Sequence, residues 1–241
     1  MLRSMGYADR IHALVDLAAF RPRTPMSVVR LRYHTIEFGE LDIHLRTLRD
    51  NQQFSDDEGE AEALGISSAF WPLFGIVWDS GNVLAHLMVE YEIVGLRILE
   101  VGCGIALASL VLNHRLADIT ATDYHPEAGA FLAENVQLNK GSLIPFIRTG
   151  WADATTALGR FDLIIGSDLL YERGQVETLA AFIEQHAKPH CEVILVDPGR
   201  GLHARFSKRM VTLGYQHSQH KPLDVSYLSQ PFRGQILQYR R

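Results

Sequence analysis

Residues 97–106 of this chain read Arg-Ile-Leu-Glu-Val-Gly-Cys-Gly-Ile-Ala, an apolar run that ends in a Gly-x-Gly turn. The run has the length and composition of a buried strand, and the segment that follows the turn has helical length. Glycine permits the sharp turn, and the first N–H groups of the helix then face a ligand that lies against it. The stretch therefore predicts a ligand-binding strand, turn and helix. Glycine also serves packing in such turns, so the motif needs a second element.

That second element is an apolar strand over residues 119–123, which ends in Asp123, nineteen residues after Gly104. An acidic residue at this distance lies at the tip of the neighbouring strand, where it accepts hydrogen bonds from ribose hydroxyls. A capping role before Pro126 is the alternative. The two elements together fit a nicotinamide dinucleotide or an adenosyl cofactor. Leu107 stands where the dinucleotide pattern places Gly or Ala, which disfavours the dinucleotide.

From residue 81 onward, apolar runs bounded by glycine or proline alternate with segments of helical length. This alternation is typical of a parallel sheet whose strands are joined by helices. We expect strands near residues 96–101, 118–123, 143–148, 161–167, 191–197, 213–219 and 234–239. We expect helices near residues 82–92, 105–115, 126–139, 173–187 and 201–212.

The first part of the chain has a different pattern. Apolar residues recur at helical spacing over residues 7–20, which predicts a short amphipathic helix. Residues 28–38 and 41–45 alternate apolar and polar around Gly39, which predicts a hairpin. Residues 55–62, SDDEGEAE, are acidic without a core pattern, and we expect a surface loop there.

Composition argues against several classes of protein. A formal net charge of -5 disfavours a nucleic-acid partner, which usually needs a clustered basic excess. The two cysteines, Cys103 and Cys191, lie far apart in apolar runs, and the eleven histidines lack a carboxylate cluster, so we expect no metal. Charges interrupt the N-terminal and later apolar stretches, so we expect no signal peptide and no membrane partner. A cytoplasmic location fits these features.

The glycine turn resembles the first motif of the seven-strand S-adenosylmethionine-dependent methyltransferases, here Glu100-x-Gly102-x-Gly104-x-Ala106. More narrowly, the chain resembles the branch of small protein-lysine methyltransferases. The features that carry this likeness are Trp78-Asp79-Ser80-Gly81, Asn135 and Asn139, Trp151, and Asp168-Leu169-Leu170-Tyr171. They cover roughly residues 70–200. The chain departs from the pattern at Ala106, where a third glycine is usual, and at Gly150, where the branch often has an acid.

The resemblance implies an α/β fold, a Rossmann-like three-layer sandwich with a seven-strand mixed sheet whose last strand is antiparallel. It implies a methyltransferase domain over residues 76–241, preceded by an extension of helix, hairpin and acidic loop over residues 1–75. The cofactor would be S-adenosylmethionine.

Carried over position by position, the resemblance implies two groups of site residues. At the cofactor, Gly102 and Gly104 would line the turn, Asp123 would hold the ribose, Trp151 with Asp153 would flank the adenine, and Trp78 would close over the ligand. Glu100 would orient the turn or bind the methionine end. Asp168 and Tyr171 would face the acceptor at the methyl end, with Asp168 also beside the cofactor. Asn135 and Asn139, one helical turn apart, are more simply structural.

The expected reaction is methyl transfer to a protein side-chain nitrogen, a lysine by resemblance. A carboxylate such as Asp168 can orient an amine and accept or relay its proton, and Tyr171 can supply an aromatic wall for the ammonium. The alternatives are an N-methyltransferase for small amines, a nicotinamide-dependent oxidoreductase and a non-catalytic binding module. Base methylation is disfavoured because residues 167–170, Ser-Asp-Leu-Leu, lack the Asp/Asn-Pro-Pro-aromatic element of such enzymes.

Asp197-Pro198-Gly199-Arg200 follows the fifth expected strand, at the same end of the sheet as the site. This segment either lines the acceptor pocket or is a Pro-Gly turn that ends the strand. The oligomeric state stays open.

Overall fold

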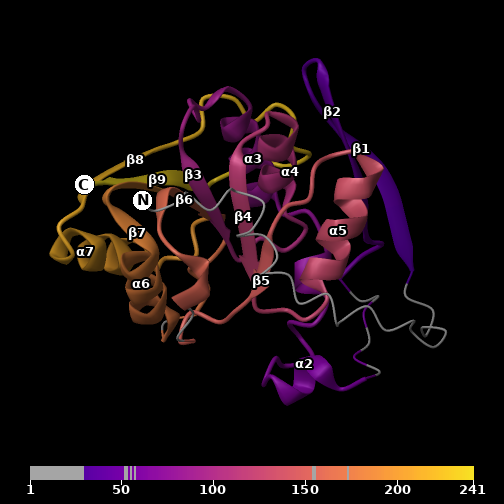
Figure 1. Cartoon of the computed structure of the whole chain (residues 1–241), viewed down its shortest axis with the longest axis horizontal. Helices are drawn as coiled ribbons and strands as arrows, with labels where there is room; N and C mark the ends of the chain where they lie inside the picture. The colour runs from indigo at the N-terminus through magenta and orange to yellow at the C-terminus, as the bar shows by residue number, and fades with distance from the viewer. Residues whose placement is uncertain (1–29, 52–53, 55, 57, 154–155, 173) are drawn as a thin grey trace, which may run out of the picture.

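The computed structural model describes residues 30–51, 54, 56, 58–153, 156–172 and 174–241 (Figure 1). The helix expected over residues 7–20 lies outside the described residues. The strands are β1 (Leu31–Phe38), β2 (Leu41–Leu48), β3 (Arg97–Val101), β4 (Asp118–Asp123), β5 (Phe146–Arg148), β6 (Phe161–Ser167), β7 (Ala187–Asp197), β8 (Gln216–His220) and β9 (Gln235–Arg240). The helices are α2 (Glu60–Ala63), α3 (Asp79–Glu90), α4 (Leu107–His114), α5 (Ala128–Leu138), α6 (Gln175–His186) and α7 (His203–Thr212), with short 3-10 turns η2 (Leu73–Gly75) and η3 (Thr156–Leu158).

The main sheet has seven strands in the order β5-β4-β3-β6-β7-β9-β8. Strands β3 to β7 are parallel, and β9 runs antiparallel to both of its neighbours, β7 and β8. The predicted mixed sheet with an antiparallel last strand is therefore confirmed. Each expected strand and helix from residue 81 onward is present, with ends that differ by a few residues.

Side chains of the central strands point alternately to the two faces of the sheet, so each face has its own hydrophobic core. Ile98, Leu163 and Ile165 pack with residues of α3, α4 and α5, whereas Leu99 and Ile164 pack with residues of α6 and α7. Helices therefore cover both faces and make the three-layer sandwich that was predicted (Figure 1).

The hairpin β1-β2 forms around Gly39, whose φ of 68° lies in the left-handed region that glycine adopts without strain. Phe38, Ile43 and Leu45 join the same core cluster as α3, α4 and α5. Figure 1 shows the hairpin beside α5, on the outer side of the molecule. The predicted hairpin is confirmed.

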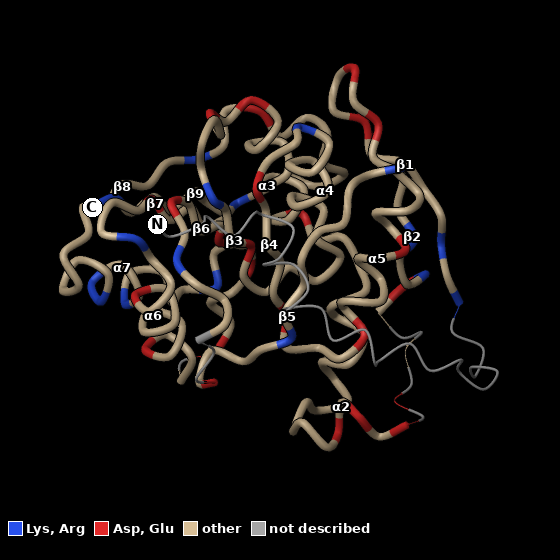
Figure 2. The backbone as a smooth tube through the Cα atoms, viewed as in Figure 1, with Lys and Arg blue, Asp and Glu red and all other residues tan. Residues whose placement is uncertain are grey.

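The acidic stretch was expected to be a loop throughout, and in part this was wrong. Residues Glu60–Ala63 form the short helix α2, whose Ala61 is fully buried. Glu58, Glu60 and Glu62 are exposed, and Figure 2 shows acidic residues gathered in and before α2.

Strands β3, β4, β5, β6 and β7 are parallel, so their carboxyl ends meet at one edge of the sheet. The predicted site residues lie at or just after these carboxyl ends, except Trp78, which precedes α3. This topology brings together loops that are far apart in the sequence.

Candidate active site

The turn after β3 has the backbone shape that a close-lying ligand requires. Gly102, Gly104 and Ala106 all have left-handed φ values, 59°, 52° and 60° respectively. A Cβ on Gly104 would lie 3.1 Å from the carbonyl oxygen of Phe74, so η2 lies against the turn. Ala106 adopts a left-handed conformation that glycine would take without strain, at a cost of about 1 kcal/mol. The departure from the pattern at this position therefore leaves the turn intact.

Asp123 ties the end of β4 to the glycine turn. Its Oδ2 accepts the N–H of Gly104 at 2.8 Å, and its Oδ1 accepts the N–H of His125 at 2.8 Å. Burial raises the pKa of this carboxyl. A carboxylate offers about four lone-pair positions, so this one can still accept a hydrogen bond from a ribose hydroxyl. The left-handed glycine turn and this fixed carboxylate fit an adenosyl cofactor.

Glu100 is buried beneath the turn. Its Oε2 accepts hydrogen bonds from the backbone N–H of Ser109, at 2.9 Å, and from the Ser109 hydroxyl. Ser109 lies in the first turn of α4, whose N–H groups lack partners within the helix. Burial raises the pKa of the Glu100 carboxyl to about 7. Of the two predicted roles, this geometry supports the one that orients the turn.

The Asp168–Tyr171 segment lies directly against the glycine turn. A Cβ on Gly102 would lie 2.6 Å from Cδ2 of Leu169, so the Leu169 side chain packs onto that glycine. Asp168 has a left-handed φ of 52°, which is uncommon for a residue with a Cβ and is typical of functional loops. The Asp168 N–H donates to the carbonyl of Val196 at 2.9 Å, which fixes this backbone to the end of β7.

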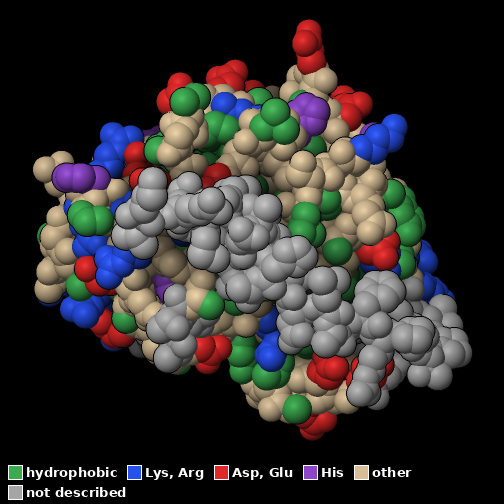
Figure 3. Space-filling model, in the orientation of Figure 1, with side chains coloured by type: hydrophobic (Ala, Val, Ile, Leu, Met, Phe, Trp, Pro, Cys, Tyr) green, Lys and Arg blue, Asp and Glu red, His purple; other side chains and the backbone are tan. Residues whose placement is uncertain are grey.

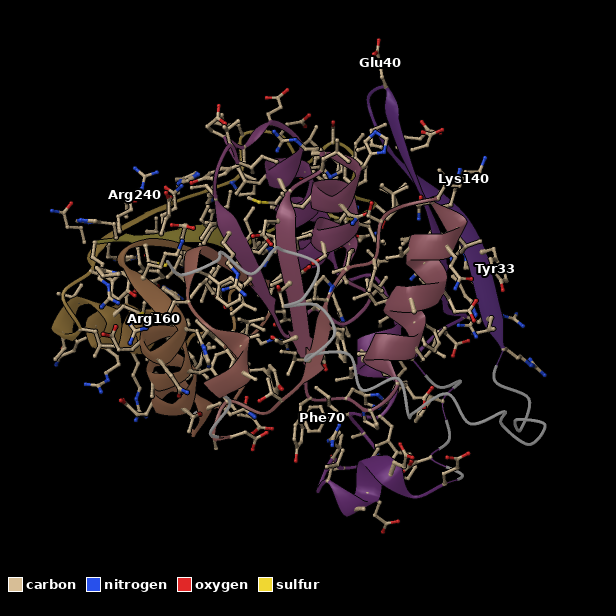
Figure 4. All side chains as sticks on the ribbon, in the orientation of Figure 1. Tyr33, Glu40, Phe70, Lys140, Arg160 and Arg240 are labelled. Atoms are coloured by element: carbon tan, nitrogen blue, oxygen red, sulfur yellow. The ribbon has the colours of Figure 1, made fainter. Side chains whose placement is uncertain are left out.

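Tyr171 lies at the outer side of this segment and is 43% exposed. Its ring centroid is 6.0 Å from that of Phe70. Figure 4 shows Phe70 between α2 and the main body of the molecule. Burial raises the pKa of the Tyr171 phenol, so its hydroxyl stays protonated at neutral pH. Phe70 was not predicted as a site residue, because nothing in its local sequence places it beside Tyr171.

The sequence named Arg200 only as part of the segment after β7 and did not predict its contact with Asp168. Its Nε donates to Oδ1 of Asp168, and its Nη2 donates to Oδ2, each at 2.6 Å. Of the two interpretations of this segment, a lining of the acceptor pocket and a plain Pro-Gly turn, the ion pair favours the first. The sequence feature that could have indicated this contact is the position of Arg200 after β7, at the same edge of the sheet as Asp168.

A model of the lysine methyltransferase family matches residues 72–208, which is more than half of the chain. The chain belongs to this family. The matched region contains the glycine turn, Asp123, the Asp168–Tyr171 segment and Arg200. The predicted family and its S-adenosylmethionine-dependent class are thereby confirmed.

Two curated relatives give the scale of the similarity. The electron transfer flavoprotein beta subunit lysine methyltransferase of Mus musculus is 29% identical over 163 residues, which cover 66% of this chain and 61% of the mouse protein. The protein N-lysine methyltransferase METTL21A of Danio rerio is 29% identical over 139 residues, which cover 52% of this chain and 62% of that protein. The chain thus matches less than two thirds of the length of either relative.

Among solved structures, the 16S rRNA N2 G1207 methyltransferase RsmC of T. thermophilus has a TM-score of 0.61 at 13% sequence identity. The match covers 90% of this chain and 52% of that protein. At this identity the likeness shows the fold alone. It confirms the Rossmann-like arrangement of the sheet.

The two tryptophans of the family pattern lie at the edges of the site. Trp78 precedes α3, and its indole N–H donates to the carbonyl of Leu73 at 3.0 Å, which ties it to η2. Trp151 follows β5 and packs against the core cluster on the α6 and α7 side. The turn at Gly150 is closed by Asp153, whose Oδ2 accepts the Gly150 N–H at 2.6 Å. The cofactor contacts of both tryptophans remain predictions.

Asn135 and Asn139 have the structural role that was expected. Asn135 exchanges hydrogen bonds with the backbone N–H and carbonyl of Arg46, at 2.7 Å and 3.2 Å. Asn139 does the same with His44, at 2.8 Å and 2.7 Å. The two amide side chains of α5 thus cover the free edge of β2 and hold the hairpin in place.

The remaining surface agrees with the charge pattern of the sequence. On the face shown in Figure 3, basic and acidic side chains are interspersed over the described residues. Among the described residues, no group of three or more His, Cys, Asp or Glu side chains is arranged to hold a metal ion. Within the same residues, no helix is long and apolar enough to cross a membrane.

Proposed function

We propose that this chain transfers a methyl group from S-adenosylmethionine to a lysine side-chain amine of a protein. The observation that carries the proposal is the contact between the Asp168–Tyr171 segment and the glycine turn, made by Leu169 on Gly102. It brings acceptor-facing groups next to the cofactor-facing turn. Membership of the lysine methyltransferase family supports the same reaction.

The proposed cofactor site uses the groups at the carboxyl ends of β3, β4 and β5. The backbone of Gly102 and Gly104 lines the cofactor, Asp123 holds the ribose, and Trp151 flanks the adenine. Trp78 closes the side next to α3. S-adenosylmethionine supplies an activated methyl group, so the chain needs chiefly to align the acceptor and exclude water.

At the acceptor side, Asp168 orients the amine through lone pairs of its carboxylate oxygens. Tyr171 and Phe70 offer aromatic surface to the aliphatic stem and to the cation that forms on the nitrogen. Such a cation–π contact contributes about 0.5–2 kcal/mol. We place the reaction in the cytoplasm, which suits two cysteines, Cys103 and Cys191, that are free and buried.

The names of the relatives suggest a first acceptor to try. The mouse relative is named for the beta subunit of electron transfer flavoprotein, and we propose that protein as one candidate substrate. The interspersed surface charge supports a protein partner over a nucleic acid.

The proposal is tested by incubating the pure protein with S-adenosylmethionine labelled in its methyl group. The acceptors are cell extract depleted of this protein and, separately, purified electron transfer flavoprotein beta subunit. We expect label in acid-insoluble protein and, after digestion, on lysine. Asp168→Ala should abolish the incorporation while it leaves cofactor affinity intact. Label found only in the small-molecule fraction would instead support a methyltransferase for small amines.

A further inference from the structure

The ion pair between Arg200 and Asp168 joins two loops at the acceptor side of the site. The guanidinium meets both carboxylate oxygens in parallel, with each distance 2.6 Å. Planar, two-point pairs of this kind fix orientation as well as charge. The Asp168 side chain is only 13% exposed, whereas Arg200 is 46% exposed. The arginine therefore lies on the solvent side of a largely buried carboxylate.

Both ends of the pair are fixed by the end of β7. The Asp168 N–H bonds to Val196, and Oδ2 of Asp197 accepts the N–H of Gly199 at 3.1 Å. Arg200 itself stands between two glycines, Gly199 and Gly201, with φ values of 98° and 85°. These left-handed positions turn the loop back towards Asp168. The backbone of both loops thus places the guanidinium on the carboxylate.

The pair determines what Asp168 can do for an amine. Both oxygens already accept a guanidinium N–H, and each keeps one lone pair for a further donor. A carboxylate balanced by a cation attracts an ammonium less strongly than a free one, so it does less to keep the acceptor protonated. Among the described residues, Asp197 and Tyr171 also interact electrostatically with the pair, and burial raises the pKa of both.

We propose that Arg200 is a positioning residue for methyl transfer, which holds Asp168 at the angle that orients the acceptor amine and leaves the amine proton to water. This rests on the proposed function. In the step, the ammonium gives its proton to water, and the neutral nitrogen forms a bond to the methyl carbon. The carbon–sulfur bond breaks with its electron pair on sulfur, and the product leaves as a methylammonium.

The test compares Arg200→Ala and Arg200→Lys with Arg209→Ala, the matched control. Arg209 lies on helix α7 and is similarly exposed, and it pairs with Glu177 of α6 at 3.0 Å. The readouts are the initial rate of labelled methyl incorporation into acid-insoluble protein of depleted cell extract, and cofactor affinity by isothermal titration. Arg200→Ala is also assayed with guanidinium chloride below denaturing concentrations, against sodium chloride of equal ionic strength.

We expect the rate of Arg200→Ala to be about 10- to 100-fold lower. A displacement of Asp168 by about 1 Å would be enough to cost about 100-fold. Arg200→Lys should lose less, guanidinium should restore part of the rate, and Arg209→Ala should match the unsubstituted protein. Cofactor affinity should be nearly unchanged, because Arg200 bonds to Asp168 and not to the glycine turn or Asp123.

Three results would overturn the role of Arg200 while the proposed function stands. They are an unchanged rate in Arg200→Ala, a loss that neither lysine nor guanidinium relieves, and a parallel loss of cofactor affinity. If the unsubstituted protein incorporates no label, the proposed function fails and the role of Arg200 fails with it.

Discussion

Glu100 is the residue whose environment has the clearest consequence for stability. It is only 4% exposed, and its bonds to Ser109 offset part of the cost of burying a carboxylate. Burial nevertheless raises its pKa from 4.5 to about 7 in the folded protein. Between these two values the folded state binds a proton that the unfolded state has lost. The contribution of Glu100 to the free energy of unfolding therefore falls as pH rises through this window, and it is constant above it.

Over the whole window, the contribution of Glu100 to the free energy of unfolding falls by about 3 kcal/mol, because each unit of pKa shift corresponds to about 1.36 kcal/mol. Glu100→Gln keeps an oxygen for Ser109 but does not titrate. We predict that the stability of Glu100→Gln relative to the unsubstituted protein increases by about 3 kcal/mol between pH 4.5 and pH 8. Urea denaturation of both proteins at the two pH values measures this change. An equal difference at both pH values would show that Glu100 has an ordinary pKa.

Single residues also show where prediction from sequence ends. Glu100, Gly102 and Asp123 belong to local motifs, so their neighbourhood could be predicted from spacing alone. The pair of Asp168 with Arg200 could not, because the two residues are 32 positions apart. Their contact depends on the left-handed backbone at Asp168 and at the glycines beside Arg200. The sequence Asp-Pro-Gly-Arg predicts a turn in either case, whether its arginine points to Asp168 or to solvent.

At the scale of elements, the attachment of the hairpin to α5 is the feature with the sharpest test. The outer edge of β2 has backbone N–H and carbonyl groups that β1 does not pair. Asn135 and Asn139 satisfy those of Arg46 and His44. An edge covered in this way is also protected from pairing with another chain.

We predict that Asn139→Ala speeds hydrogen exchange at the His44 amide and that Asn135→Ala does so at the Arg46 amide. Asn135 is fully buried, so its substitution should also lower the free energy of unfolding by about 1–3 kcal/mol. Gln137→Ala, at an exposed position of the same helix, is the matched control and should change neither quantity. Hydrogen exchange followed by NMR measures the exchange rate of each of these amides. Unchanged protection at positions 44 and 46 would mean that the hairpin is held by its apolar contacts alone.

Element ends were predicted less well than element types. Helix α3 begins three residues before its expected start, because the N-cap is Trp78, a residue with no capping side chain and so no local signal. Strand β7 begins four residues early, because Ala187 leaves α6 directly into the sheet without an intervening loop. In both places tertiary packing decides the boundary, and a single sequence carries little information about it.

For the whole molecule, the alternation of strands and helices was enough to predict an α/β fold. The strand order was not derivable from that rhythm; the seven-strand arrangement was implied by the family resemblance and is present in the structure. The docking of the hairpin onto α5 was likewise not predictable, since it depends on two side-chain amides that meet a distant strand edge. The division into residues 1–75 and 76–241 stays a prediction.

The central claim is that the glycine turn and Asp123 bind S-adenosylmethionine, and isothermal titration tests it most directly. The titrations use S-adenosylmethionine and S-adenosylhomocysteine with the unsubstituted protein, with Asp123→Ala, and with Asp118→Ala at the exposed start of the same strand. We predict saturable binding of both ligands, weakened about 10-fold or more in Asp123→Ala by loss of the ribose hydrogen bonds, and unchanged in Asp118→Ala. Absence of binding to the unsubstituted protein, or equal affinity in Asp123→Ala, would contradict this account of the site.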